Sequence, residues 1–169
     1  MEKIAKFVVK STENINWMEK KAIQFYSHLF GQSDVLGEKY VEENLSVQKL
    51  IKLQNDFSIE ILAVYDDETP LSFMKMNSSR LSNQNLDANK ALGLGNIIYF
   101  NTEELIPLLE RAEAIAVQRK HDLIWIKLFE TDTILLNALE SKGYLNFDFE
   151  VNNNENLYPK EIYLKKAIH

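Results

Sequence analysis

The stretch that decides the fold runs from Ile97 to Tyr144 and reads IIYFNTEELIPLLERAEAIAVQRKHDLIWIKLFETDTILLNALESKGY. It contains a short apolar strand at 97–100, a long amphipathic helix, a second apolar strand at 124–130 and another helix that ends at Gly143. A strand–helix–strand–helix unit predicts two parallel, buried strands that lie side by side in one sheet. Folds of this kind place binding sites where a helix follows its strand.

Length and composition indicate one globular domain spanning residues 1–169. The chain has 169 residues, of which 46% are hydrophobic and 26% charged. It contains no cysteine, which excludes disulfides, thiolate nucleophiles and zinc sites with sulfur ligands. Its three histidines stand far apart in the sequence, so we expect no metal site.

Charge and hydropathy exclude two further classes of partner. The net charge of −6 argues against a nucleic-acid surface, which needs clustered Lys and Arg side chains. No apolar run approaches the ~18 residues of a membrane span, and the N-terminus lacks the apolar core of a signal peptide. We therefore expect a cytoplasmic protein without membrane contact.

The first part of the chain predicts one strand followed by three helices. A strand is expected at 4–10, and a helix from Ile15 to Leu29 that Gly31 ends. A second helix is expected at 34–44 with Asp34 as its N-cap, and a third at 47–53 with Ser46 as its N-cap. These helices are expected to cover the sheet or line a substrate pocket.

The remaining segments predict further strands around the central unit. Residues 58–65 and 71–77 form a hairpin, and a polar loop at 78–91 leads to the strand at 97–100, so that Gly93 and Gly95 precede that strand. Alternation at Leu145, Phe147, Phe149 and Val151 predicts a strand with one buried face. After a turn at 152–156, a strand at 162–164 closes the sheet.

This order of elements, together with several local sequences, resembles the GNAT superfamily of N-acetyltransferases, and particularly its bacterial polyamine-acetyltransferase-like branch. Residues 25–30 and 40–46 are similar to the first helices of that branch, and FMKMN at 73–77 to its third strand. IWIKLFE at 124–130 is similar to its fifth strand. Ser72 stands where the family usually has a glycine.

The resemblance implies an α+β (mixed α/β) fold of three α/β/α layers. Its central, mixed, seven-stranded sheet splays between strands four and five and is flanked by about four to five helices. The implied activity is transfer of an acetyl group from acetyl-CoA to a small-molecule amine. The family's backbone contacts to the acetyl and pantetheine groups fall on Ile98, Tyr99 and Phe100. Asp132 aligns with a position that caps a helix or hydrogen-bonds pantetheine.

The expected diphosphate-binding turn departs from the family pattern [Gln/Arg]-x-x-Gly-x-[Gly/Ala]. The corresponding residues 101–107, NTEELIP, contain neither glycine nor arginine and form a shorter turn. Glu103 and Glu104 lie at the helix N-terminus, where they complement the helix dipole and repel a diphosphate. Asn101 and Glu104 also fit a capping arrangement. We interpret this segment as the start of a capped structural helix. Its own glutamates are expected to occupy the anion site.

The expected catalytic groups are also incomplete, and two hypotheses stay open. The family often uses a tyrosine of helix four to protonate the departing thiolate, and Leu139 occupies that position here. Tyr99 and Glu130 remain as candidates for proton transfer, although packing and surface roles suit them equally well. The chain is either a divergent acetyltransferase or a GNAT-fold protein without catalysis, serving as a binding or regulatory module through a homodimer interface.

Overall fold

The computed structural model describes residues 3–9, 11–79, 88–148 and 158–168. They contain one seven-stranded sheet with the order β1-β2-β3-β4-β5-β7-β6, in which β4 and β5 are parallel and the other neighbours antiparallel. The mixed seven-stranded sheet is therefore confirmed. Its strands are β1 Lys3–Val8, β2 Ile59–Asp66, β3 Thr69–Asn77, β4 Ala91–Ile98, β5 Leu123–Phe129, β6 Leu145–Asn146 and β7 Glu161–Ala167.

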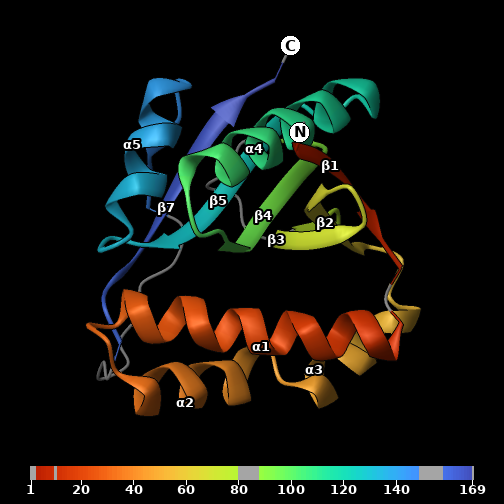
Figure 1. Ribbon diagram of the computed structural model, residues 1–169. Coiled ribbons are helices and arrows are strands. Elements are labelled where there is room, and N and C mark those ends of the chain that lie inside the picture. The colour runs from red at the N-terminus through yellow and green to blue at the C-terminus, as the bar shows by residue number, and fades with distance from the viewer. Residues whose placement is uncertain (1–2, 10, 80–87, 149–157, 169) are drawn as a thin grey trace.

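The helices form a layer on each side of the sheet, so the predicted α/β/α architecture is also confirmed. In Figure 1, α1, α2 and α3 lie below the sheet, and α4 and α5 lie above it. A short 3-10 helix follows α3 at Leu53–Asn55. The helices are α1 Thr12–Leu29, α2 Asp34–Asn44, α3 Val47–Lys52, α4 Thr102–Gln118 and α5 Thr133–Ser141.

Serine side chains cap the helices of the lower layer. Ser46 Oγ accepts a hydrogen bond from Lys49 N at 3.2 Å, as predicted for α3. For α2 the predicted cap, Asp34, is wrong. Ser33 Oγ accepts from Leu36 N at 3.2 Å, and Asp34 lies in the first turn instead, where its charge still complements the helix dipole.

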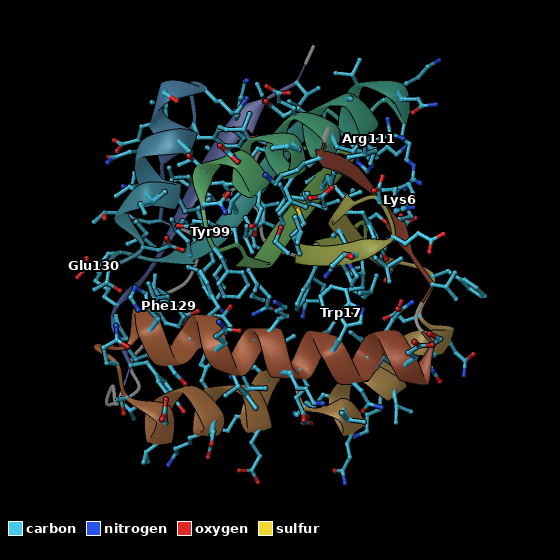
Figure 2. The ribbon with its side chains drawn as sticks, in the orientation of Figure 1. Lys6, Trp17, Tyr99, Arg111, Phe129 and Glu130 are labelled. Carbon is cyan, nitrogen blue, oxygen red and sulfur yellow. The ribbon has the colours of Figure 1, made fainter. Side chains whose placement is uncertain are left out.

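Apolar side chains fill the space on both faces of the sheet. Trp17 of α1 packs edge-on against Phe73 of β3, with ring centroids 5.6 Å apart, and lies between α1 and the sheet (Figure 2). On the other face, α4 buries Leu105, Leu108 and Leu109, which recur at helical spacing. Burying each of these leucines contributes about 1.5–3 kcal/mol.

The strand that leads to α4 begins earlier than predicted. β4 spans Ala91–Ile98, so Gly93 and Gly95 lie inside it, and Tyr99 and Phe100 follow it. The start of this strand was predicted wrongly because glycine is unfavourable inside strands and therefore interrupts the sequence pattern of a strand. Leu92 and Leu94, which alternate with these glycines, are buried on one face of the strand, whereas the glycines occupy the other.

The strand predicted after Tyr144 is also shorter. β6 consists of Leu145 and Asn146, and Leu145 is 71% exposed, so the predicted buried face is wrong at this residue. Phe149, Val151 and the turn at 152–156 lie outside the described residues. Within the described part of the chain, no helix has the length and apolar composition needed to cross a membrane.

Candidate functional site

The sheet opens between its two parallel strands. β4 pairs with β5 from Ala91 opposite Leu123 to Leu94 opposite Ile126. Beyond that pair, β4 continues to Ile98 and β5 to Phe129, but the described register contains no further pairing between them. The predicted splay between strands four and five is therefore present.

A β-bulge bends β4 at the start of this opening. Opposite β3, Lys75 pairs with Gly95 and Phe73 with Ile98, so β4 carries one extra residue between these pairs. Asn96 lies in this bulge with a φ of 47°, a left-handed conformation that asparagine tolerates better than most residues. Its side-chain Nδ2 donates a hydrogen bond to Tyr26 Oη of α1 at 3.2 Å. The bulge thus links the opening to the helical layer below it.

Two glycines of β4 form the floor of the opening. A Cβ atom at Gly93 would lie 2.6 Å from the Trp125 ring, so the indole lies directly over the Gly93 backbone. A Cβ atom at Gly95 would meet nothing within 4 Å. Glycine inside a strand often marks a place where another group approaches the backbone closely. Gly95 leaves such a space free.

Above this floor lies a cavity of ≈ 230 Å³ between the sheet and the helices α1 and α2. Lys127 and Glu161 form an ion pair at its edge with an N–O distance of 3.1 Å. Lys75 also lines the cavity, and its burial lowers the pKa of its ammonium group. The cavity is also lined by Tyr26, Tyr40, Asn77, Asn96, Trp125 and Phe129.

Aromatic rings form one wall of this cavity. The rings of Tyr26 and Tyr40 have centroids 4.5 Å apart, and Phe129 lies 5.4 Å from Tyr40. Burial raises the pKa of both tyrosine hydroxyls, so both stay protonated at neutral pH. The wall therefore offers apolar ring faces and neutral hydroxyl groups.

Tyr99 and Asp132, both predicted as site residues, are in direct contact. The Tyr99 hydroxyl donates a hydrogen bond to Asp132 Oδ1, and the same carboxylate caps α5 by accepting from Leu135 N at 3.4 Å. Burial raises the pKa of Asp132 to about 6, and it also raises the pKa of Tyr99. The hydroxyl proton of Tyr99 is thus bonded to the carboxylate that caps α5.

The other residues proposed for chemistry do not join this pair. Glu130 is exposed and projects from the edge of the molecule, whereas Tyr99 lies inside (Figure 2). Glu130 does not line the cavity, and its role in proton transfer stays a prediction. Leu139 is fully buried in α5 and supplies no polar side-chain atom.

A second cavity, of ≈ 790 Å³, lies beside the Tyr99–Asp132 contact. Lys20 of α1 and Ile134 of α5 line it, together with the partly exposed ring of Phe100. Phe25, Leu29 and Asp132 line both cavities. Tyr99 lines only the second cavity, so Asp132 is the member of this pair that borders both spaces.

The N-terminus of α4 is capped by its own residues. Asn101 Oδ1 accepts from Glu104 N at 3.1 Å, which confirms the predicted capping arrangement. The buried Glu104 carboxylate in turn accepts from Phe100 N at 3.2 Å and from Asn101 Nδ2 at 2.9 Å. The segment predicted as a turn is already helical from Thr102.

The two glutamates at this end differ in their surroundings. Glu103 is exposed and forms an ion pair with Lys3 of β1 at 2.9 Å, so it faces away from the site. Glu104 alone occupies the place where the resemblance puts a diphosphate. These residues do not fit that part of acetyl-CoA, because a carboxylate stands there and the Phe100 N–H is already bonded.

Sequence reasoning missed Lys75, Gly95 and the tyrosines of α1 and α2 as site residues. A signal was present in the polar residues Lys75 and Asn77, which alternate with apolar ones in β3. Another was the pair of glycines spaced two apart before Ile97. Among the described residues, no group of three or more acidic or histidine side chains is arranged to hold a metal ion.

Comparison with known proteins identifies the fold. No family model and no curated protein matches the sequence. PaiA N-acetyltransferase from Thermoplasma acidophilum, in complex with coenzyme A, matches with a TM-score of 0.75 and 15% identity over 99% of both chains. A probable acetyltransferase from Staphylococcus epidermidis matches with a TM-score of 0.71 and 15% identity, also over 99% of both chains. Spermidine N-acetyltransferase from Vibrio cholerae, in complex with CoA and spermine, matches with a TM-score of 0.66 and 10% identity. The match covers 99% of this chain and 96% of the other.

These similarities show that the chain has the fold of the GNAT N-acetyltransferases over nearly its whole length. The fold predicted from the order of elements is thereby confirmed. Sequence identities of 15% or less leave the activity to be argued from the site itself.

Proposed function

We propose that this protein binds a small molecule in the opening between β4 and β5 and does not use acetyl-CoA as an acetyl donor. The observation that carries the proposal is the buried Glu104 carboxylate, which accepts hydrogen bonds from Phe100 N and Asn101 Nδ2. The diphosphate of acetyl-CoA would have to compete with this carboxylate for the same end of α4.

Electrostatics makes that competition unfavourable. A helix N-terminus attracts an anion through its unpaired N–H groups and its dipole, and Glu104 already supplies such an anion. Two like charges about 4 Å apart repel by ~4 kcal/mol at an effective dielectric constant of 20. A diphosphate would therefore have to displace Glu104, which would leave the Phe100 N–H without its partner.

The small-molecule site is supported by features away from α4. Gly95 keeps the floor of the cavity open, and the bulge at Asn96 holds β4 away from β5. The aromatic rings of Tyr40 and Phe129 form a wall beside this floor. A concave, largely apolar pocket with a few polar groups is the usual form of a ligand site.

Acetyl transfer to an amine is the second candidate function, favoured by the splayed strands and by the coenzyme A present in two of the similar structures. The spermine in one of them supports an amine acceptor. Cofactor contacts would then come from the backbone of Ile98 and Tyr99, because Phe100 N is bonded to Glu104. The proton donor would have to be Tyr99, whose hydroxyl is bonded to Asp132.

Thermal unfolding in the presence of acetyl-CoA separates the two functions. We expect the melting temperature of the full chain to stay within about 1 °C up to millimolar acetyl-CoA. Binding with a useful affinity would add ~2.7 kcal/mol at 100 times Kd and raise the melting temperature by several degrees. Such a rise, together with acetylation of spermidine by the same protein, would establish the second function instead.

A further inference from the structure

Among the described residues, none acts as a counter-ion for the ammonium group of Lys75 in the cavity. Its side chain lies on β3, half-buried, and makes no ion pair or hydrogen bond with another described residue. Burial and the nearby Lys127 both lower the pKa of this ammonium group. A partly desolvated cation without a partner is stabilised when an anion binds beside it.

The carboxylates around the cavity are already engaged. Glu161 forms its ion pair with Lys127 at 3.1 Å. Asp132 accepts hydrogen bonds from the Tyr99 hydroxyl and from Leu135 N. Asp132 keeps its negative charge above pH ~6, but among the described charged side chains that line the cavity only Lys75 makes neither an ion pair nor a hydrogen bond, and its positive charge disfavours an amine ligand beside it.

The uncharged polar groups also present donors. Asn77 Oδ1 accepts from Ser79 N at 2.9 Å and from Ser79 Oγ at 2.6 Å, which leaves the NH₂ group of Asn77 to donate. Tyr26 Oη accepts a hydrogen bond from Asn96 Nδ2 at 3.2 Å.

Free space lies beside the ammonium group. Gly95 is the residue paired with Lys75 across the β3–β4 ladder, and no atom would contact a Cβ at this position within 4 Å. The rings of Trp125 and Phe129 line the same cavity. An anionic group can therefore lie over Gly95 while an apolar body contacts the rings.

We propose that this cavity binds a small carboxylate with an aromatic or apolar body, its carboxylate paired with Lys75 over Gly95. The volume of ≈ 230 Å³ lies below the ~300–1,000 Å³ of sites for drug-sized ligands, so the ligand is small. The inference rests on the proposed function, because it names the ligand class of the same opening. It assigns the site a charge preference opposite to that of an amine-binding site.

Three probes of similar size and different charge test this preference. Benzoate, benzamide and benzylamine are titrated separately into the full chain, and binding is followed by calorimetry and by chemical shifts of the backbone amides around Gly95. We expect benzoate to bind at least about tenfold more tightly than either of the others, as for one charge-assisted hydrogen bond. Equal or tighter binding of benzylamine, or no binding of benzoate, would overturn the proposal.

Two variants with a matched control locate the site. Lys75→Met removes the charge and keeps the apolar stem, and Gly95→Ala fills the space beside it without contacting another residue. Each is expected to weaken benzoate binding by at least about tenfold. Lys49→Met also removes one positive charge, but from the exposed side of α3, and should leave the affinity for benzoate unchanged. Unchanged affinity in Lys75→Met would contradict the assignment.

The results with benzoate and with acetyl-CoA are independent of each other. Stabilisation by acetyl-CoA with a retained preference for benzoate would refute the proposed function and leave Lys75 as the carboxylate site. Loss of the benzoate preference without stabilisation by acetyl-CoA would refute the carboxylate site alone.

Discussion

The two ends of the segment from Gly95 to Glu104 differ in one respect that matters for function. At Gly95 the chain leaves space next to Lys75, whose ammonium group pairs with no other residue in the described part of the chain. At Glu104 it places a carboxylate where the fold could receive an anion, and this carboxylate bonds the nearby donors. The proposed function therefore gives the two ends separate roles, a ligand pocket at Gly95 and a blocked anion site at Glu104. Each end can therefore be tested by its own substitutions.

The largest expected effect concerns the glycine floor. Gly93→Ala would place a Cβ atom 2.6 Å from the Trp125 ring, which must then move into the cavity. We expect the free energy of unfolding to fall by about 3 kcal/mol, in the range of overpacked sites. Gly95→Ala, where the space is free, should change it by less than about 0.5 kcal/mol. Urea unfolding followed by tryptophan fluorescence measures the free energy of unfolding of both variants. Equal losses of stability would contradict the difference in free space between Gly93 and Gly95.

The next effect concerns the carboxylate shared by the two cavities. The pKa of Asp132 is raised to about 6, so the folded protein binds this proton more tightly than the unfolded chain. Its stabilisation is fully present below the unfolded pKa of 3.8 and is lost as the pH rises through about 6. The wild type loses this stabilisation as the pH rises, and Asp132→Asn does not. The difference in the free energy of unfolding should therefore shift by about 2 kcal/mol in favour of Asp132→Asn from pH 4 to pH 7. A constant difference across this range would show that the pKa of Asp132 is not raised.

A smaller effect is expected at the closed end. Glu104→Ala removes the acceptor for Phe100 N and Asn101 Nδ2, and we expect a loss of about 1–2 kcal/mol in the free energy of unfolding. Glu103→Ala removes an exposed ion pair with Lys3 and should leave stability nearly unchanged. Chemical unfolding of the two variants compares them directly. Similar losses in both would contradict the distinct role given to Glu104.

Local sequence patterns predicted those parts of the site that depend on residues close together in the chain. The contacts between Asn101 and Glu104 span three positions, and capping residues follow regular spacings. The position of Asp132 as N-cap of α5 was predicted for the same reason. The order of strands and helices followed from hydrophobic periodicity, which reports on burial along each element.

Contacts between distant segments were out of reach of this reasoning. Lys75 lies beside Gly95 only because β3 and β4 pair in one particular register, with the bulge at Asn96 shifting it. Lys3 reaches Glu103 across a hundred positions of sequence, which no local pattern encodes. The strand containing Gly93 and Gly95 was placed too late because its stability comes from pairing on both sides rather than from its own residues.

The most direct test of the closed cofactor site is a titration of acetyl-CoA into the isotope-labelled protein, observed at the backbone amides of Phe100, Asn101 and Glu104. The account predicts no change in these resonances at millimolar acetyl-CoA, because the Glu104 carboxylate and the Asn101 side chain already occupy this end of α4. Saturable shifts at these three amides would place the diphosphate there and contradict the account.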